Sequence, residues 1–559
     1  METTSEKKDL LEELKSRFTQ LETNRQRFIG RWQEAQQYVA ASVYDWNNLD
    51  AIPEAPKRFS SSPCNYLKIL TSGLIGYSLS PHIIWFKLSM ENKKLLNLYG
   101  VKDWLEQCEE ILYSYFNKSN LYQNSTGFIE DSACIGHGVL MINDNLKNGS
   151  LRYSRMRPNE LYLDSNEDGE VDTIYRKFLI TLRNAVELFG LENLSETRQD
   201  DYKDVKKWNN QFEVLHAVYP RRDRDTGLPD SKNMPFASIY VDIGQDYIIM
   251  ESGYEDFPYA VFLWNPIAGF AYGESPVMGA MTDIRALNVM EESRLKIAQM
   301  SAEPPLQASD SLRNISLVPR GITYKKKDET IDVIRTGENY PITIDVVNQK
   351  KQEVKDWFNV DFFLMLQSQE GRQMTATEVM ELQGEKAAVL SNLIVNLNVA
   401  LSKIITRSFN ILIKAGVMPP IPEALAGNGG QLSIDFMGPL AQAQKKYHSM
   451  GGITSALNFI GPIMQLYPNS GDFIDGDELM KRALEGQGVP EAVIREDDDV
   501  NKIREERAQA QAEAQAQAQQ QQMLQDVMGN ASQLNEPIRQ GSVLSDLNEQ
   551  LAGGLNGGQ

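Results

Sequence analysis

The spacing of apolar residues divides the first half of the chain into helical and strand-like stretches. Residues 6–40 carry Leu, Phe and Trp side chains at helical intervals with charged residues between them, which predicts a surface helix packed on a larger body. Residues 102–118 predict a second helix with one apolar face. Between about 138 and 265 the period falls towards two, and Gly, Pro, Asn and Asp separate the apolar runs. This stretch predicts a mixed α/β region, with one short helix near residues 181–190.

The pattern after Pro276 predicts two helices on either side of a small cap. The first helical run ends at Pro304 and Pro305, because proline cannot continue a helix. Short strand-like runs then occupy residues 306–343, and a helical pattern resumes in the segment VVNQKKQEVKDWFNVDFFLML.

A polar break, QSQEGRQM, precedes the clearest helix start in the sequence. Thr375 or Thr377 is suited to cap this helix, with Glu378 in its first turn, and apolar spacing continues to about Lys414. Such a helix is far longer than the mean of about 11–12 residues. The Gln- and Ala-rich segment from about Arg507 is helix-prone but has almost no apolar stripe. It is either a solvated tail or a helix that packs against copies of itself.

Length and composition limit the class of protein. At 559 residues the chain exceeds a single hydrophobic core, and 42% hydrophobic with 24% charged residues is typical of globular proteins. No apolar run reaches the ~18–20 residues that span a bilayer, and the N-terminus has no apolar signal core. We therefore expect a soluble, unsecreted protein with no membrane partner. The three cysteines have no CxxC spacing, which offers neither a disulfide framework nor a zinc site.

The formal net charge of −20 argues against a protein that grips nucleic acid, because such grip depends on Lys and Arg at phosphates. An acidic wall would instead repel the DNA backbone, so the charge is compatible with a conduit along which DNA slides. The alternative is that the chain is one of many acidic soluble proteins.

One segment, Asp164 to Asp172, has the D-x-N-x-D-G start of a calcium loop. Its twelfth position is Tyr175 in place of the bidentate Glu, and both flanks are strand-like. We favour a hairpin turn at Asp168 and Gly169, with a weak cation site as the alternative.

Other candidate chemistry is sparse. His82, His137, His216 and His448 have no spacing that indicates a metal or a base, so we expect structural or surface roles for them. The stretch that starts at Gly273, GESPV, lacks the closing Gly of a nucleophile elbow. The sequence contains no GxxxxGK[ST] phosphate loop, which argues against an ATP-driven packaging motor.

Five segments in order resemble those of one known family, the portal proteins or head-to-tail connectors of short-tailed (podovirus-type) bacteriophages. They are LTSGLIGYSLSPHIIWFKL, FAYGESPVMGAMTDIRALNVMEE, EPPLQASDS, VPRGITY and RQMTATEVMEL. None is specific alone, but together they cover about residues 20–415 in the expected order.

The resemblance implies an α+β, mostly helical portal fold with wing, stem, clip and crown, assembled as a ring that is usually a dodecamer. The implied parts are an N-terminal α/β wing body (1–265), a first stem helix (266–302), a clip (303–345), a second stem helix (346–365), a tunnel loop (366–374), a long wing helix (375–416), a crown (417–498) and a Gln/Ala-rich C-terminal helix, either barrel or flexible tail (499–559).

The resemblance also implies where the chain would meet DNA and its partners. The tunnel loop would face DNA at the narrowest part of the channel through Gln367, Gln369, Glu370 and Arg372. In a ring, Arg372 would supply one cation per copy and brake the DNA. The basic run Lys325, Lys326 and Lys327 would contact phosphates or an acidic partner face at the clip, although a solvated hairpin is the simpler interpretation.

The implied function is that of a virion protein at a unique capsid vertex, assembled in the host cytoplasm, through which double-stranded DNA is packaged and ejected. Expected partners are further copies of the chain, capsid and scaffolding proteins, the terminase large subunit and then tail adaptor or nozzle proteins. We expect no enzymatic activity, cofactor or metal. The alternatives are another oligomeric virion protein of the tail or capsid, and a hydrolase or nuclease, which would need convergent carboxylates or a His–metal set.

Overall fold

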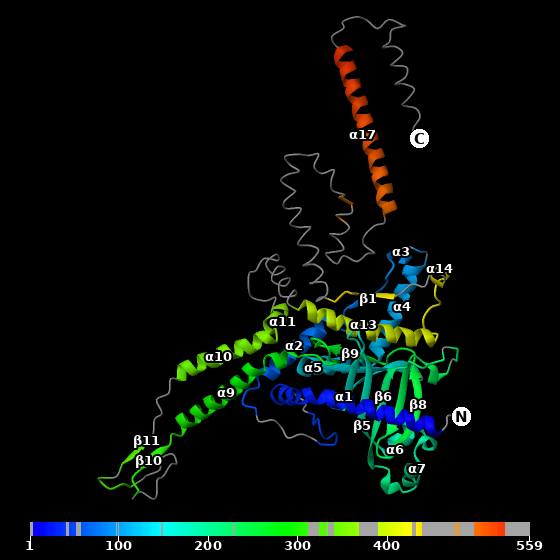
Figure 1. The fold of residues 1–559 in the computed structure, drawn as a ribbon. Helices are drawn as coiled ribbons and strands as arrows, with labels where there is room; N and C mark the ends of the chain where they lie inside the picture. The colour runs from blue at the N-terminus through cyan, green and yellow to red at the C-terminus, as the bar shows by residue number, and fades with distance from the viewer. Residues whose placement is uncertain are drawn as a thin grey trace. The chain divides into compact units, whose positions relative to one another are not determined.

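In the computed structural model the chain forms two compact units, Met1–Gly452 and Ile453–Gln559, which are described separately (Figure 1). The structure describes residues 4–40, 44–51, 58–96, 98, 100–146, 149–225, 227–228, 230–310, 324–328, 330–333, 340–367, 390–426, 432–438, 476–477, 480 and 497–531.

The described helices of the first unit include those predicted at residues 6–40, 102–118 and 181–190, together with several that the sequence pattern did not predict. They are α1 (Thr4–Tyr38), α2 (Ser62–Ser78), α3 (Lys93–Leu96), α4 (Val101–Lys118), α5 (Leu121–Ile135), α6 (Leu182–Phe189), α7 (Glu196–Tyr202), α8 (Pro276–Gly279), α9 (Met281–Ala302), α10 (Tyr340–Trp357), α11 (Val360–Gln367), α13 (Ser391–Lys414) and α14 (Glu423–Ala426). Within the described ranges, no helix is both long and apolar enough to cross a bilayer.

The strands of the first unit form antiparallel sheets. They are β1 (Phe86–Met90), β2 (His137–Asn145), β3 (Ser150–Arg155), β4 (Leu161–Ser165), β5 (Val171–Thr181), β6 (Gln211–Pro220), β7 (Phe236–Asp242), β8 (Tyr247–Tyr254), β9 (Tyr259–Leu263), β10 (Leu306–Ala308), β11 (Ile331–Val333) and β12 (Leu432–Phe436). The larger sheets have the orders β4-β5-β6-β7-β8 and β3-β2-β9.

Helices cover both faces of the five-stranded sheet. Successive side chains of a strand point to opposite faces, so each strand contributes to both contacts. Leu215 and Ala217 of β6 face α1, where they pack with Leu14 and Leu21. Side chains of the opposite face, including Val214, pack against α6. This alternation is the period of two that predicted the sheet.

The largest core of the unit joins α2, α4, α5 and α13 to the three-stranded sheet. In α13 the side chains of Leu397, Ile404 and Leu412 are buried at helical spacing. Strand β12 returns to pair with β1, with Phe86 opposite Phe436. Strand β12 lies within the predicted crown (417–498), so this part of the crown pairs directly with the N-terminal body.

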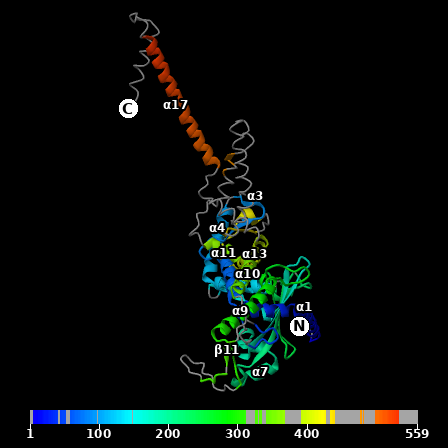
Figure 2. The same cartoon turned by 90° about the vertical axis from the view of Figure 1, so that its left-hand side faces the viewer.

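An arm of two antiparallel helices extends from this body. Helices α9 and α10 run side by side in both views, and the paired strands β10 and β11 lie at the far end of the arm (Figures 1 and 2). The predicted helices before and after residues 306–343 are thus confirmed, and the described part of that segment contains the paired strands β10 and β11.

Several boundaries differ from the prediction. The first helix of the arm is interrupted at Ala280, and the returning helix begins at Tyr340, earlier than the expected residue 346. It also breaks at Asn359, whose backbone φ is 49°. The predicted caps Thr375 and Thr377 lie outside the described residues, whereas α13 confirms the second half of the long helix.

The second unit contains helix α17 (Asp497–Ala531), which includes the Gln- and Ala-rich segment. Arg504 near its start contacts Asp477 through two hydrogen bonds of 2.6 Å. The helical prediction is confirmed here. The choice between a barrel and a tail stays a prediction.

Candidate functional site

The arm begins at a close contact between two glycine backbones. A Cβ at Gly136, where φ is +90°, would lie 2.0 Å from the Gly273 carbonyl oxygen, and a Cβ at Gly273 would lie 2.4 Å from the Gly136 carbonyl oxygen. Neighbouring Tyr272 is buried, and its phenol oxygen accepts a hydrogen bond from Leu163 N at 3.2 Å. The YGESP motif is therefore shaped by packing at the base of the arm.

Ser275 in the same motif caps the helix that leads into the arm. Its hydroxyl accepts a hydrogen bond from Met278 N at 3.1 Å and donates one to the Cys134 carbonyl at 2.8 Å. Pro276 stands in the first turn, where its missing N–H costs nothing. The buried serine thus has a structural role.

Apolar packing and ion pairs join the two helices of the arm. Val347 and Val354 of α10 are buried in the same core as Ile284 and Leu287 of α9. The carboxylate of Glu291, whose side chain is only 4% exposed, contacts Lys351 at 2.6 Å. It also contacts Arg294 of its own helix at 2.7 Å, so this buried charge is paired both within α9 and across to α10.

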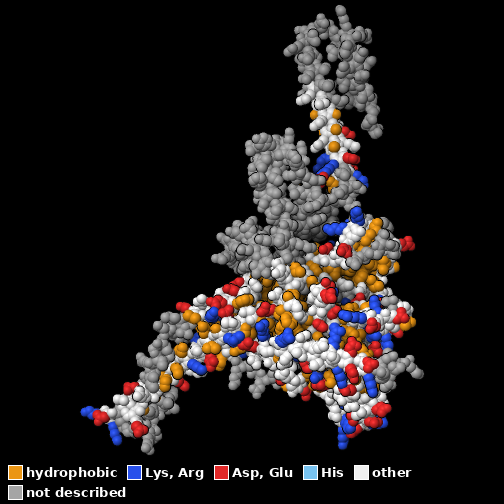
Figure 3. All heavy atoms as spheres, viewed as in Figure 1, with side chains coloured by type: hydrophobic (Ala, Val, Ile, Leu, Met, Phe, Trp, Pro, Cys, Tyr) orange, Lys and Arg blue, Asp and Glu red, His pale blue; other side chains and the backbone are white. Residues whose placement is uncertain are grey.

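Beyond its base the arm carries exposed apolar side chains. Val289, Leu295 and Met300 of α9 are 60%, 44% and 47% exposed, and Val346 of α10 is 40% exposed. Figure 3 shows hydrophobic side chains along the visible face of the arm. Exposed apolar side chains of this size are candidates for a protein–protein contact.

The arm has no excess of either charge. Residues 281–357 contain 12 acidic and 12 basic residues, so their formal charge is zero. Residues 451–559 contain 17 acidic and 7 basic residues, which gives −10, or half of the total of −20. The prediction of an acidic, repulsive channel wall gains no support from the arm.

The basic run lies in the segment between the two strands at the end of the arm. Lys325, Lys326 and Lys327 are exposed, and Tyr324 before them is 87% exposed. Basic side chains are visible at this end of the arm (Figure 3). The run is thus accessible to a partner, and its role as a contact stays a prediction.

The predicted tunnel loop lies mostly outside the described residues. Gln367 is the last residue of α11, while Gln369, Glu370 and Arg372 are not described. Helix α11, which precedes this segment, is held against α2 because Phe363 is fully buried there.

The calcium-loop motif forms a β-hairpin turn, as we favoured. Asn166 accepts hydrogen bonds from Asp168 N at 3.0 Å and Glu170 N at 2.9 Å, and Gly169 adopts a φ of +82°. Asn166 is one of the side chains that a calcium loop would aim at an ion, and here its oxygen is used within the turn instead.

The histidines that the structure describes have structural or surface positions. His216 is buried between Ser238, 3.0 Å from Nε2, and Tyr259, 3.3 Å from Nδ1. Burial lowers the pKa of His216 and of buried His137 to about 3. His82 is exposed, and His448 lies outside the described residues.

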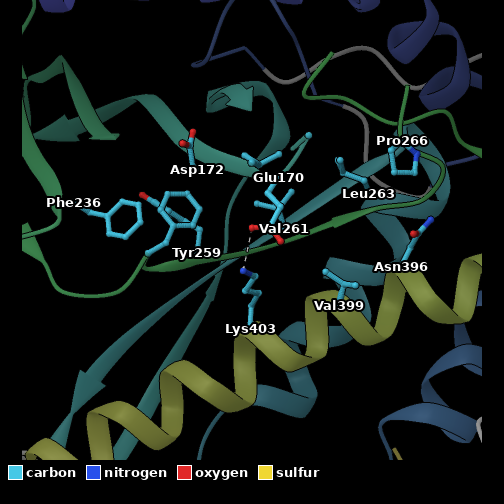
Figure 4. Close-up of a pocket in the computed structure, with 13 residues that line it drawn as sticks. Glu170, Asp172, Phe236, Tyr259, Val261, Leu263, Pro266, Asn396, Val399 and Lys403 are labelled. Atoms are coloured by element: carbon cyan, nitrogen blue, oxygen red, sulfur yellow. Dashed lines mark hydrogen bonds and ion pairs between the residues drawn. The ribbon is translucent and has the colours of Figure 1, made fainter. Parts of the chain in front are cut away.

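A cavity of about 220 Å³ opens between β9, the β4–β5 hairpin and α13 (Figure 4). Phe236, Tyr259 and Val399 contribute to its walls, and Lys403 of α13 contacts Glu170 of the hairpin at 3.4 Å. Sequence reasoning missed this cavity because its walls come from segments that are distant in the sequence.

Comparisons with known proteins identify the family of the chain. The chain is 31% identical over 458 residues to the portal protein of Salmonella phage epsilon15, covering 79% of this chain and 80% of that protein. It is 28% identical over 511 residues to the probable portal protein of Bordetella phage BPP-1, covering 89% and 90% of the two chains. The family model described as bacteriophage head to tail connecting protein matches residues 11–494. The chain therefore belongs to the bacteriophage head to tail connecting protein family.

Proposed function

We propose that this protein is a phage portal: a ring at a unique capsid vertex through which double-stranded DNA enters the head and later leaves it. Its relatives named as portal proteins match most of the chain. The observation that carries the proposal is the arm, a two-helix projection with exposed apolar side chains and a small two-stranded tip.

The exposed apolar side chains supply the contact between neighbouring copies. Full burial of a Val, Leu or Met side chain stabilises an assembly by about 1.5–3 kcal/mol relative to full exposure. Val289, Leu295 and Met300 are each about half exposed, so they retain a large part of that energy for association. A dodecamer would arrange such arms side by side around a central axis.

The arms would then form the channel wall. Because residues 281–357 have a formal charge of zero, this wall would neither bind nor strongly repel the DNA backbone. In this arrangement, tight contact with DNA would be left to the loop after α11, where Arg372 would form a ring of charge and Gln367, Gln369 and Glu370 would keep the loop polar.

The tip would meet the proteins outside the head. Lys325, Lys326 and Lys327 would contact the terminase large subunit during packaging, and tail adaptor or nozzle proteins afterwards. The body would contact capsid and scaffolding proteins. In this role the chain is structural, without catalysis, and is a component of the virion that assembles in the host cytoplasm.

The first experiment tests assembly through the arm. Val289→Glu and Leu295→Glu place charges on the apolar surface, whereas Val205→Glu, at a position 66% exposed between α7 and β6, is the matched control. Sedimentation velocity should show rings for the control and smaller species for the arm variants. Rings of unchanged size in both arm variants would refute this use of the arm.

The second experiment tests the loop. Arg372→Ala should fold and assemble, because the change is confined to the loop, but should alter the amount of DNA packaged or retained in the head. Unaltered packaging and retention would remove Arg372 from the proposal.

A further inference from the structure

Strand β9 lies at one edge of its three-stranded sheet, which has the order β3-β2-β9. Its hydrogen bonds to β2 show which of its residues face that strand. Trp264 N donates to the Gly136 carbonyl, and Ile142 N donates to the Pro258 carbonyl. Both pairs continue the register of β2 and β9, so the residues of β9 at even-numbered positions bond to β2.

The odd-numbered residues of β9 direct their backbone groups away from β2. In an antiparallel ladder, successive residues present their N–H and C=O groups to opposite sides of the strand. Tyr259, Val261 and Leu263 therefore present these groups at the outer edge of β9. No hydrogen bond joins them to the backbone of another described residue. A free edge of this kind is a template for a strand from another chain.

The cavity of about 220 Å³ lies beside this free edge. Its lining includes Tyr259, Val261 and Leu263, the residues whose backbone groups point outward (Figure 4). Phe236 and Phe257 add aromatic surface to its walls. An added strand needs such a combination, because its backbone bonds to the edge while alternate side chains enter an apolar space.

Charged side chains also line the cavity. Glu170 and Asp172 belong to its wall, and Lys403 of α13 contacts Glu170 at 3.4 Å (Figure 4). The side chains of Lys403 and Glu170 are 56% and 58% exposed, and an exposed ion pair holds only weakly, so this one can open for a ligand. Two carboxylates beside one ammonium group favour a segment that carries a Lys or Arg.

The short length of the free edge indicates which partner it suits. Three residues of β9 offer backbone groups, so an added strand forms few hydrogen bonds, and each gives little net stability because it replaces a bond to water. A freely diffusing peptide must also offset the loss of its translational freedom. A neighbouring copy in a ring is already held close by, and its high effective concentration makes a short contact sufficient.

We propose that the outer edge of β9 accepts an extended segment of a neighbouring copy as an added strand. Apolar side chains of that segment occupy the cavity, and a basic side chain contacts Glu170 and Asp172. The inference rests on the proposed ring. A ring closes through head-to-tail contacts between two different surfaces of each copy, and the edge of β9 is one of these surfaces.

Amide hydrogen exchange resolved to single residues tests the added strand, in rings and in dissociated chains separated by size. The amides of Ala260 and Phe262 bond to β2 and should exchange slowly in both forms, so they are the internal control. The amides of Val261 and Leu263 should exchange ~10-fold or more slowly in rings than in dissociated chains, because exchange requires a hydrogen bond to open.

Each other outcome overturns the inference in a recognisable way. Rings in which Val261 and Leu263 exchange as fast as in the dissociated chain would exclude the added strand and leave the proposed ring intact. Equally slow exchange in the dissociated chain would show that the edge is covered within one copy. A protein that forms no rings would overturn both this inference and the proposed function.

Two variants of α13 test the cavity itself. Val399, which lines the cavity, is 51% exposed, and Val395, one turn earlier and outside the lining, is 52% exposed. Val399→Asp should raise the protein concentration at which half of the chains are assembled by ~10-fold or more, whereas Val395→Asp should leave it unchanged. Sedimentation velocity over a dilution series measures this concentration. Equal effects of the two substitutions would contradict docking in the cavity.

Discussion

Replacing Gly73 with alanine places a methyl group where α2 meets α11. The added Cβ would lie 2.2 Å from Cδ1 of Phe363, whereas carbon atoms prefer a separation of about 3.5–4.0 Å. Phe363 is fully buried, so its ring cannot turn towards solvent. Overpacking of this kind costs about 1–3 kcal/mol in stability.

The same helix provides a matched control at Gly76. A Cβ there meets no atom within 4 Å, so Gly76→Ala should be neutral or stabilise the protein by about 0.5–1 kcal/mol through helix propensity. Urea denaturation should therefore separate two identical substitutions that lie three residues apart.

A double-mutant cycle with Phe363→Ala, which removes the clashing Cγ and Cδ1 atoms, identifies the physical cause. If the cost of Gly73→Ala arises from the aromatic ring, the smaller side chain should recover about 0.5–3 kcal/mol of it as coupling energy. Equal effects of alanine at Gly73 and Gly76, or strict additivity with Phe363→Ala, would refute the assigned packing of α2 against α11.

The remaining predictions concern acid stability, the arm and its cap. His216 has a folded pKa of about 3 against an ordinary value of 6.5, so the unfolded chain binds the extra proton and stability is lost as pH falls from 6.5 towards 3. The stability lost through protonation of His216 should reach about 2 kcal/mol at pH 5. His216→Gln should therefore reduce the difference between the urea midpoints at pH 7 and pH 5. An unchanged difference would contradict a buried, neutral His216. Glu291→Leu should destabilise the arm by about 1–3 kcal/mol, less than a fully buried pair because Lys351 is 27% exposed, and faster proteolysis within α9 and α10 is the readout. Ser275→Ala should cost about 0.5–2 kcal/mol as a lost helix cap, measured by urea denaturation, and no change would argue against the cap.

Local periodicity was sufficient to predict most elements of the first unit. The helices at Thr4–Tyr38 and Val101–Lys118 and the strands between residues 137 and 263 follow the spacing of their apolar residues. The hairpin at Asp168 and Gly169 followed from turn chemistry, because a glycine at positive φ is favoured there.

Contacts between distant segments were not predictable in the same way. The pairing of β1 with β12 joins Phe86 to Phe436, and no local pattern indicates which partner a short strand selects. Helix α5 (Leu121–Ile135) was missed because its buried face includes polar and small residues such as Ser125, Gly127 and Asp131, which do not form an apolar stripe.

Sequence alone predicted the elements of the candidate site but not its surface. The two helices of the arm followed from the hydrophobic pattern, whereas its exposed apolar side chains required the structure, since a Leu at helical spacing is usually expected in a core.

Electron microscopy of the purified protein tests the central claim most directly. A portal should appear as closed rings with a central hole, with the two-helix arms gathered around the axis. Discrete monomers or long tubes would contradict the proposed function.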